Sequence, residues 1–190
     1  MVPTLNPGNI VFVTRTIPIG PFKPKVGDIV FFNTPNELEA AVQQYVTSST
    51  TEKQGEESSG GGNTNDISSV ASTKGKQFLK RVVAIPGENV GVKRSEPFVQ
   101  LSDNKYRFDI IGPYARPEVF PESSWDRSVS KLGKGEYFVA GDNGYRSVDS
   151  RVWGPLKDKY IVGVAKWVLW PLKDFGPIQP GQISEITKQQ

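Results

Sequence analysis

The sequence predicts an all-β fold made of curved, mostly antiparallel sheets or of a partly closed barrel. Short runs of β-branched and aromatic residues recur along the chain. The chain has 19 glycines and 15 prolines, many of which separate these runs, and its apolar residues scarcely follow the helical period. A length of 190 residues suits one domain, with or without an insertion.

The first half of the chain holds four of the expected strands. β-branched and aromatic residues fill 10–14, and 29–32 is a short apolar run typical of a buried strand. Residues 77–85 form a longer run that stops at the turn formers Pro86-Gly87, and 89–93 follows directly. The segment 17–25 has three prolines and a glycine, which predicts a loop.

The second half holds the remaining expected strands, separated by an irregular stretch. We expect strands at 98–101, 106–111 and 136–140, and a long apolar strand at 161–170 closed by Pro171. The segment 112–134 is rich in proline and is predicted to be irregular, and the tail 173–190 shows no clear period.

A low-complexity insertion is predicted to divide the domain. Residues 1–36 and 77–172 form the single β domain, 37–76 the insertion and 173–190 a C-terminal tail. The part 47–76 is dominated by Ser, Thr, Gly, Gln and Glu, and buries too little apolar surface to offset its chain entropy, so it is expected to be disordered or mobile. A short helix at 37–45 and a docking role for the insertion remain open.

Composition excludes several kinds of chemistry. The chain has neither cysteine nor histidine, which excludes disulfides and Ser-His-Asp or Cys-His catalysis and disfavours a zinc site, so no metal or cofactor is expected. A catalytic base would have to be a lysine or a carboxylate. The net charge of +3 is too small to indicate a nucleic-acid partner. No apolar run is long enough to cross a bilayer and none resembles a signal peptide, so the printed chain is expected to be soluble.

The segment 141–154 gathers turn formers, hydroxyls, acids and arginines. Asn143-Gly144 favours a turn, and Ser147, Asp149 and Arg151 then fall at every second position. In an extended backbone all three would project from one face, where the carboxylate and the guanidinium pair beside a hydroxyl. A polar loop between two strands explains the same residues equally well.

Lys80 lies inside an apolar strand. A period of two places Phe78, Lys80 and Val82 on one face of it and Arg81 on the other. If the first face is inward, burial lowers the pKa of Lys80 toward the range of a general base, and Ser147 could orient the neutral amine. The alternative is that Lys80 and Arg81 are ordinary charges at a sheet edge.

Four segments in this order resemble type I signal peptidases. They are Met-Val-Pro-Thr-Leu at 1–5, Gly-Asp-Ile-Val-Phe at 27–31, Lys-Arg-Val-Val-Ala-Ile-Pro-Gly-Glu at 80–88 and Gly-Asp-Asn followed by Ser-Val-Asp-Ser-Arg-Val-Trp-Gly within 141–154. The resemblance implies a membrane-anchored serine protease with a β fold. Such an enzyme uses a serine nucleophile and a lysine base to remove signal peptides from exported preproteins, with its catalytic domain on the trans side of a plasma or thylakoid membrane.

The resemblance also implies roles for individual residues. Lys80 matches the general base, Ser147 the hydroxyl that positions it, and Asp149 and Arg151 the supporting ion pair. The structural start of the family motif at 141–154 is matched by Gly141, Asp142 and Asn143, and the pocket for small substrate side chains by Met1, Leu5, Val11, Phe78 and Leu79.

Three departures from the family pattern affect the functional interpretation. The family's nucleophilic serine directly precedes the residue matched by Met1, so this serine, the second oxyanion donor and the membrane helix are missing from the printed sequence. Gly144 stands where the family usually has arginine, and the insertion is longer than usual. The printed chain is therefore predicted to be truncated at its N-terminus and inactive.

Other interpretations stay open. Another serine could act as the nucleophile, although Ser147 and Ser150 already belong to the supporting motif at 141–154. The chain could also be an inactive relative that binds extended peptides at a sheet edge, or a self-cleaving Ser-Lys protease of the repressor type, a family that the 141–154 motif fits poorly.

Overall fold

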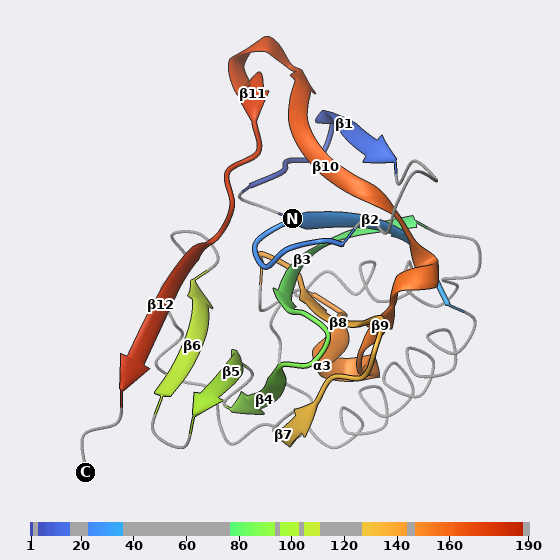
Figure 1. The fold of residues 1–190 in the computed structure, drawn as a ribbon. Coiled ribbons are helices and arrows are strands. Elements are labelled where there is room, and N and C mark those ends of the chain that lie inside the picture. Colours follow the sequence, from blue (N-terminus) through green and yellow to red (C-terminus); the bar gives the residue numbers. More distant parts are fainter. Residues whose placement is uncertain are drawn as a thin grey trace, which may run out of the picture.

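The computed structural model describes residues 1, 4–15, 23–35, 77–93, 96–102, 105–110, 127–143 and 147–187. These residues form two antiparallel β-sheets, which Figure 1 shows joined through the central strands. The predicted helix at 37–45 and the predicted insertion at 37–76 lie outside the described residues.

The larger sheet has the strand order β1-β10-β2-β3-β8-β9, and β11 pairs with one end of β10. Its strands, in this order, are β1 (Ile10–Arg15), β10 (Ile161–Trp170), β2 (Ile29–Asn33), β3 (Gln77–Ala84), β8 (Glu136–Ala140), β9 (Leu156–Lys157) and β11 (Gly176–Pro177). The ten-residue strand β10 curves along this sheet and rises beyond it to the top of Figure 1.

The smaller sheet has the order β12-β6-β5-β4-β7. Its strands are β12 (Gln182–Thr187), β6 (Lys105–Ile110), β5 (Glu96–Ser102), β4 (Asn89–Lys93) and β7 (Arg127–Lys131). Close packing within it depends on Gly91, because a Cβ there would lie 2.6 Å from the Phe98 ring on the neighbouring strand. One α-helical turn, α3 (Ser150–Trp153), and two 3₁₀ turns, η3 (Asp158–Tyr160) and η4 (Leu172–Asp174), complete the described elements.

The antiparallel pairings confirm the predicted all-β class, and the eight expected strands all exist. Two segments differ from the prediction. Residues 127–131, expected to be irregular, form β7, and the tail, which shows no clear period in the sequence, contributes β11 and β12. Residues 150–153 form α3, so the backbone from 147 to 151 is not extended throughout.

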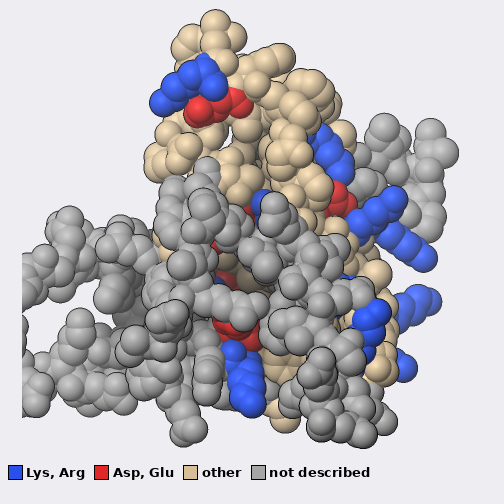
Figure 2. All heavy atoms as spheres, turned by 90° about the vertical axis from the view of Figure 1, so that its left-hand side faces the viewer, with Lys and Arg blue, Asp and Glu red and all other residues tan. Residues whose placement is uncertain are grey.

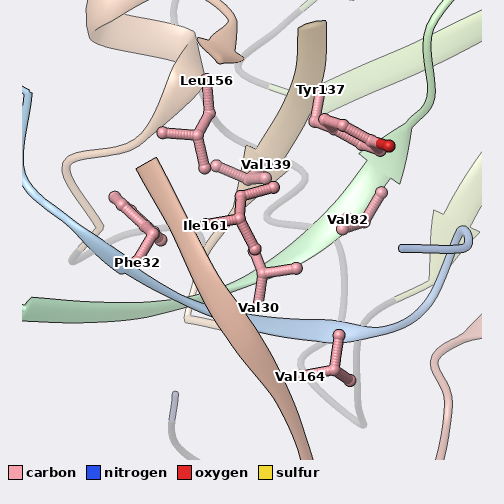
Figure 3. Close-up of a cluster of buried hydrophobic side chains, with 8 residues drawn as sticks. All are labelled: Val30, Phe32, Val82, Tyr137, Val139, Leu156, Ile161 and Val164. Carbon is pink, nitrogen blue, oxygen red and sulfur yellow. The ribbon is translucent and has the colours of Figure 1, made fainter. Parts of the chain in front are cut away.

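The core consists of three clusters of buried apolar side chains. The first cluster is formed by side chains from β2, β3, β8, β9 and β10 of the larger sheet and is drawn in Figure 3. Its members are Val30, Phe32, Val82, Tyr137, Val139, Leu156, Ile161 and Val164. The second connects the two sheets and contains Val83, Ala84, Val90, Val92, Val99, Leu132, Phe138 and Ala140. The third, formed by Leu5, Ile29, Ala165 and Val168, packs beneath β1 and the N-terminal segment.

Strand β3 contributes to all three clusters, as its alternating side chains predict. Val82, with Phe78 packed alongside, belongs to the first cluster; Val83 belongs to the second, and Leu79 packs against the third. Because β3 runs between β2 and β8, its residues are fixed from both sides. The two charged residues in its middle, Lys80 and Arg81, are therefore held in a rigid part of the fold.

Candidate active site

Lys80 and Ser147 meet in the structure, although 67 residues separate them in the sequence. The Lys80 Nζ donates a hydrogen bond of 2.7 Å to the Ser147 Oγ. Lys80 pairs with Val30 on β2 and lies next to Arg81, which pairs with Ala140 on β8. The alternative that Lys80 is a charge at a sheet edge is therefore wrong, since β3 is an inner strand.

Burial lowers the pKa of Lys80 below its ordinary value of 10.5. Desolvation of the ammonium is the largest cause, because the charged form loses more hydration than the neutral amine. The carboxylates of Asp149 and Asp142 oppose this effect, whereas the positive charge of Arg151 adds to it. The site therefore favours a neutral amine, as a general base requires.

Asp149 lies two residues after Ser147 and caps the helical turn that follows. Its side chain accepts a hydrogen bond of 3.2 Å from the Arg151 backbone N–H, which makes it the N-cap of α3. The turn of α3 brings the Arg151 guanidinium back onto the same carboxylate, with Nε at 2.7 Å and Nη2 at 2.6 Å. Asp149 and Arg151 therefore form an ion pair, but they do so around a helical turn and not across one face of an extended strand.

The Asp149 carboxylate is completely buried and joins α3 to strand β8. It accepts a further bond of 2.9 Å from the backbone N–H of Gly141, and the Ser150 Oγ accepts one of 3.0 Å from Val139. Burial acts to raise the pKa of Asp149, but the hydrogen bonds and charge of Arg151, with help from Lys80 and Gly141, lower it below its ordinary 3.8. Asp149 therefore remains ionised beside Lys80.

Gly141 provides the space in which the two side chains meet. A Cβ at this position would overlap the Ser147 hydroxyl and would lie 2.7 Å from the Ser147 Cβ and 3.3 Å from the Lys80 Nζ. No side chain fits there without moving the Lys80–Ser147 pair.

Arg81 and Asp142 form a second buried ion pair beside the first. The Arg81 Nε and Nη2 donate bonds of 2.9 and 2.8 Å to the two Asp142 oxygens, and the two side chains are 2% and 0% exposed. Sequence reasoning assigned only a structural role to Asp142 and treated Arg81 as an ordinary charge. The signal that it missed is the pair of adjacent cations in an inner apolar strand, because a buried charge needs a partner.

The predicted substrate-pocket residues fall into two groups. Met1, Val11 and Leu79 pack against the third cluster, which contains Leu5, so these four side chains lie together. Phe78 packs against the first cluster instead. Asn143 is half-buried and directly follows the buried Asp142.

The backbone of Met1 reaches the site. The Met1 carbonyl accepts a bond of 2.9 Å from the Leu5 N–H, which closes a turn. Burial lowers the pKa of the Met1 amine, and the charge of Lys80 lowers it further. The amine is therefore close enough to Lys80 for the two charges to interact.

Neither a metal-ion site nor a membrane-spanning helix is found in the described part of the chain. Within the described segments, no three carboxylates gather in a way that would hold a metal ion. Among the same segments, no helix has both the length and the hydrophobicity that are needed to cross a membrane.

Comparisons with known proteins agree on one family. The profile of the signal peptidase, peptidase S26 family matches residues 1–170. Signal peptidase I V of Bacillus subtilis is 35% identical over 100 residues, which cover 47% of this chain and 55% of that protein. Signal peptidase IB of Staphylococcus aureus (strain Mu50) is 29% identical over 114 residues, which cover 55% of this chain and 59% of that protein.

A solved structure and the extent of these matches complete the comparison. A signal peptidase I from Enterococcus faecalis V583 superposes with a TM-score of 0.42 at 22% identity, over 75% of this chain and 97% of that one. The chain spans little more than half the length of the two relatives named above, with 55% and 59% covered. Because the family profile covers residues 1–170 of 190, the chain belongs to the signal peptidase family, peptidase S26.

Proposed function

We propose that this chain is the catalytic domain of a signal peptidase that cleaves signal peptides from exported preproteins with a serine nucleophile and Lys80 as the base. The observation that carries the proposal is the hydrogen bond of 2.7 Å between the Lys80 Nζ and the Ser147 Oγ in a site that lowers the pKa of the amine. A neutral, oriented amine is what a lysine base needs to accept a hydroxyl proton.

The nucleophile in this proposal is a serine joined to the Met1 amine, outside the printed sequence. Its support is the position of that amine, which is near enough to Lys80 for their charges to interact. A side chain on the preceding residue would start from the same place. The described serines of 141–154, Ser147 and Ser150, already have other partners. The Ser147 Oγ accepts a hydrogen bond from Lys80, and the Ser150 Oγ accepts one from the Val139 backbone N–H, so neither is available as the nucleophile.

The residues of the site would act in sequence during cleavage. Neutral Lys80 takes the serine proton while the serine oxygen attacks the carbonyl carbon of the scissile bond, which gives a tetrahedral intermediate. Lysine then returns the proton to the leaving amine as the C–N bond breaks and an acyl-enzyme remains. Water, deprotonated by Lys80, attacks the ester, and the serine leaves with that proton. Ser147 holds the amine in line throughout, and Asp149 with Arg151 holds Ser147.

The substrate side chains would contact the apolar surface beside the site. Met1, Leu5, Val11 and Leu79 form one small cluster there, and small residues before the cut, as in the Ala-x-Ala pattern, would suit it. Phe78 belongs to the same prediction but contacts a different cluster.

The decisive experiment restores the proposed serine. A chain extended by Gly-Ser before Met1 is compared with a Gly-Ala extension, using a peptide with an Ala-x-Ala cleavage site and mass spectrometry of the products. Cleavage by the Gly-Ser chain alone, and its loss in the same chain carrying Lys80→Met, is expected. Cleavage by the Gly-Ala chain, or retained cleavage with Lys80→Met, would contradict the proposal.

A peptide-binding module without catalysis is the second candidate. The observation that favours it is the position of β1, which pairs only with β10 among the described strands and so leaves one edge open to an added strand. This candidate predicts that the Gly-Ser chain binds the peptide without cutting it, as measured by fluorescence anisotropy.

The proposal also places the protein at a membrane, with the domain on the exported side of a plasma or thylakoid membrane. It is supported by exposed apolar side chains around β1 and the β10–β11 hairpin: Ile10, Phe12, Trp167, Leu169, Trp170, Leu172 and Phe175. Figure 2 shows tan surface at the tip of this hairpin, at the top, next to one blue and one red patch. Tryptophan at the edge of such a patch suits a lipid headgroup region.

Vesicle binding tests this placement. Trp170→Ser with Leu172→Ser should weaken co-sedimentation with phosphatidylglycerol-containing vesicles and reduce the blue shift of tryptophan fluorescence. Leu101→Ser is the control, since Leu101 is also exposed, at 41%, but lies in the smaller sheet. Equal binding by all three proteins would contradict the placement.

A further inference from the structure

Arg81 makes more interactions than an ion pair requires. Besides binding Asp142, its Nη1 donates bonds to the carbonyl oxygens of Gly27 at 2.7 Å and Gln179 at 3.2 Å, and its Nη2 donates to the Thr4 Oγ1 at 3.3 Å. Its residue exposure is 2%, and it is the largest of the fully buried side chains. One guanidinium thus connects four segments that lie far apart in the sequence.

Two of these segments border the Lys80–Ser147 pair. Asp142 follows Gly141, whose N–H bonds to Asp149 and whose Cα faces Ser147. Thr4 lies in the turn that joins Met1 to Leu5. Arg81 therefore fixes both Asp142, next to the glycine that lies against Ser147, and the segment that brings Met1 near Lys80.

The contact at Gln179 comes from a C-terminal segment beyond residue 170, where the family match ends. We call this segment, residues 176–187, the strap. Its β11 pairs with β10 and its Ile178 N–H bonds to the Lys166 carbonyl at 2.9 Å. Its β12 pairs with β6 along six residues, so the strap runs from the larger sheet to the smaller one (Figure 1).

The strap passes next to Arg81. Gln179 contributes its carbonyl, and Pro180 packs against Gly27, where a Cβ would lie 3.4 Å from the proline Cβ. Gly27 itself accepts the shortest of the Arg81 bonds. The strap thus contacts the guanidinium directly through Gln179 and lies against Gly27, which accepts from the same Nη1; both contacts favour one orientation of the planar group.

We propose that Arg81 is a positioning residue for the Lys80–Ser147 pair, and that the strap acts on the site by holding Arg81. Arg81 lies next to Lys80 on β3 but binds Asp142, so a movement of the guanidinium also moves Asp142 and the adjacent Gly141, which lies against Ser147. A displacement of about 1 Å is enough to cost a reaction on the order of 10²-fold in rate. The effect on cleavage rests on the function proposed above, whereas the effect on Lys80 does not.

The test reads the titration of Lys80 directly. Lysine labelled with ¹³C at Cε is followed by NMR against pH, and the Lys80 signal is assigned by its loss in Lys80→Met. The variants are Arg81→Lys, which keeps a charge but loses the planar fork, Pro180→Gly, and a chain that ends at Phe175. A chain that ends at Thr187 is the matched control, since it keeps the whole strap.

We expect Arg81→Lys and the chain ending at Phe175 to keep their β circular dichroism while the pKa of Lys80 moves toward its ordinary value, because water enters a loosened site. Pro180→Gly should give a smaller shift in the same direction, and the chain ending at Thr187 none. If the shorter chain does not fold, Arg81→Lys and Pro180→Gly decide the question. An unchanged Lys80 titration in folded Arg81→Lys and Pro180→Gly, even with a lower Tm, would overturn the inference, because a purely structural role predicts that result.

Cleavage by the Gly-Ser extended chain separates this inference from the proposed function. Arg81→Lys in that chain should lower kcat by on the order of 10²-fold with little change in KM. If the parent extended chain does not cleave but the Lys80 titration moves in the variants, the proposed function fails and the positioning role stands. If the parent cleaves and the titration does not move, the function stands and the positioning role fails.

Discussion

Asp149→Asn tests how the site is held together. The Asp149 carboxylate is fully buried and accepts four hydrogen bonds, three of them from Arg151 and one from Gly141. The variant keeps the shape of the side chain but removes the charge opposite a guanidinium that is only 4% exposed, and it turns one acceptor into a donor. Breaking a buried ion pair in this way costs about 3–5 kcal/mol.

This cost is large enough to measure by heat and by urea. For a domain of this size, about 3–5 kcal/mol corresponds to a fall in Tm of roughly 6–20 °C. Asp158→Asn is the control, since Asp158 is exposed, and it should change the free energy of unfolding by no more than about 0.5 kcal/mol.

A double variant shows whether the charge is the cause. Asp149→Asn together with Arg151→Met removes both charges, so it should be less destabilised than Asp149→Asn alone. A loss below about 1 kcal/mol for Asp149→Asn, or a double variant at least as unstable as the single one, would refute the reasoning.

Three further predictions concern neighbouring residues. Burial lowers the pKa of Lys80, so between that lowered pKa and 10.5 the unfolded chain binds more protons than the folded one, and the free energy of unfolding should rise with pH. Lys80→Met should flatten this rise, as measured by urea denaturation at several pH values. An identical slope in the variant would contradict the prediction. Gly141→Ala should cost about 1–3 kcal/mol and displace the Ser147 signals in NMR, whereas Gly133→Ala, where the nearest atom is the end of the Glu136 side chain at 3.0 Å, should cost less and leave those signals in place; equal effects would contradict the tight fit. Glu88→Gln should cost about 1.5 kcal/mol, because Glu88 accepts two bonds from Arg107 and one from the Ile85 N–H; an unchanged Tm would argue against this link.

Local sequence patterns predicted eight of the strands that the structure describes. Alternation along β3 placed Phe78 and Val82 in one cluster and Leu79 in another, because side chains in a strand project to opposite faces whatever surrounds them. The Lys80–Ser147 contact needed the family resemblance, since 67 residues separate the two and no local rule brings them together.

The parts that were missed depend on contacts distant in sequence. β12 forms because β6 offers it an open edge, and its own residues carry no period that announces a strand. The sequence left open whether Asp149 and Arg151 pair across an extended face or lie in a polar loop. In the structure the Asp149 carboxylate both caps the backbone N–H of Arg151 and binds its guanidinium, which favours the turn α3. The role of Arg81 was hidden because all four of its partner segments lie more than 50 residues away in the sequence.

The pairing of β2 with β3 has a practical consequence for protein engineering. Asn33 lies opposite Gln77, and their side chains share a hydrogen bond of 3.1 Å, so the chain leaves the sheet and returns to it at adjacent points. Whatever connects two adjacent points can be shortened or exchanged without stretching the strands that it joins. This junction is therefore a natural place to graft a reporter or an affinity tag, since the amine and hydroxyl of the site belong to parts of the chain that such a graft leaves intact.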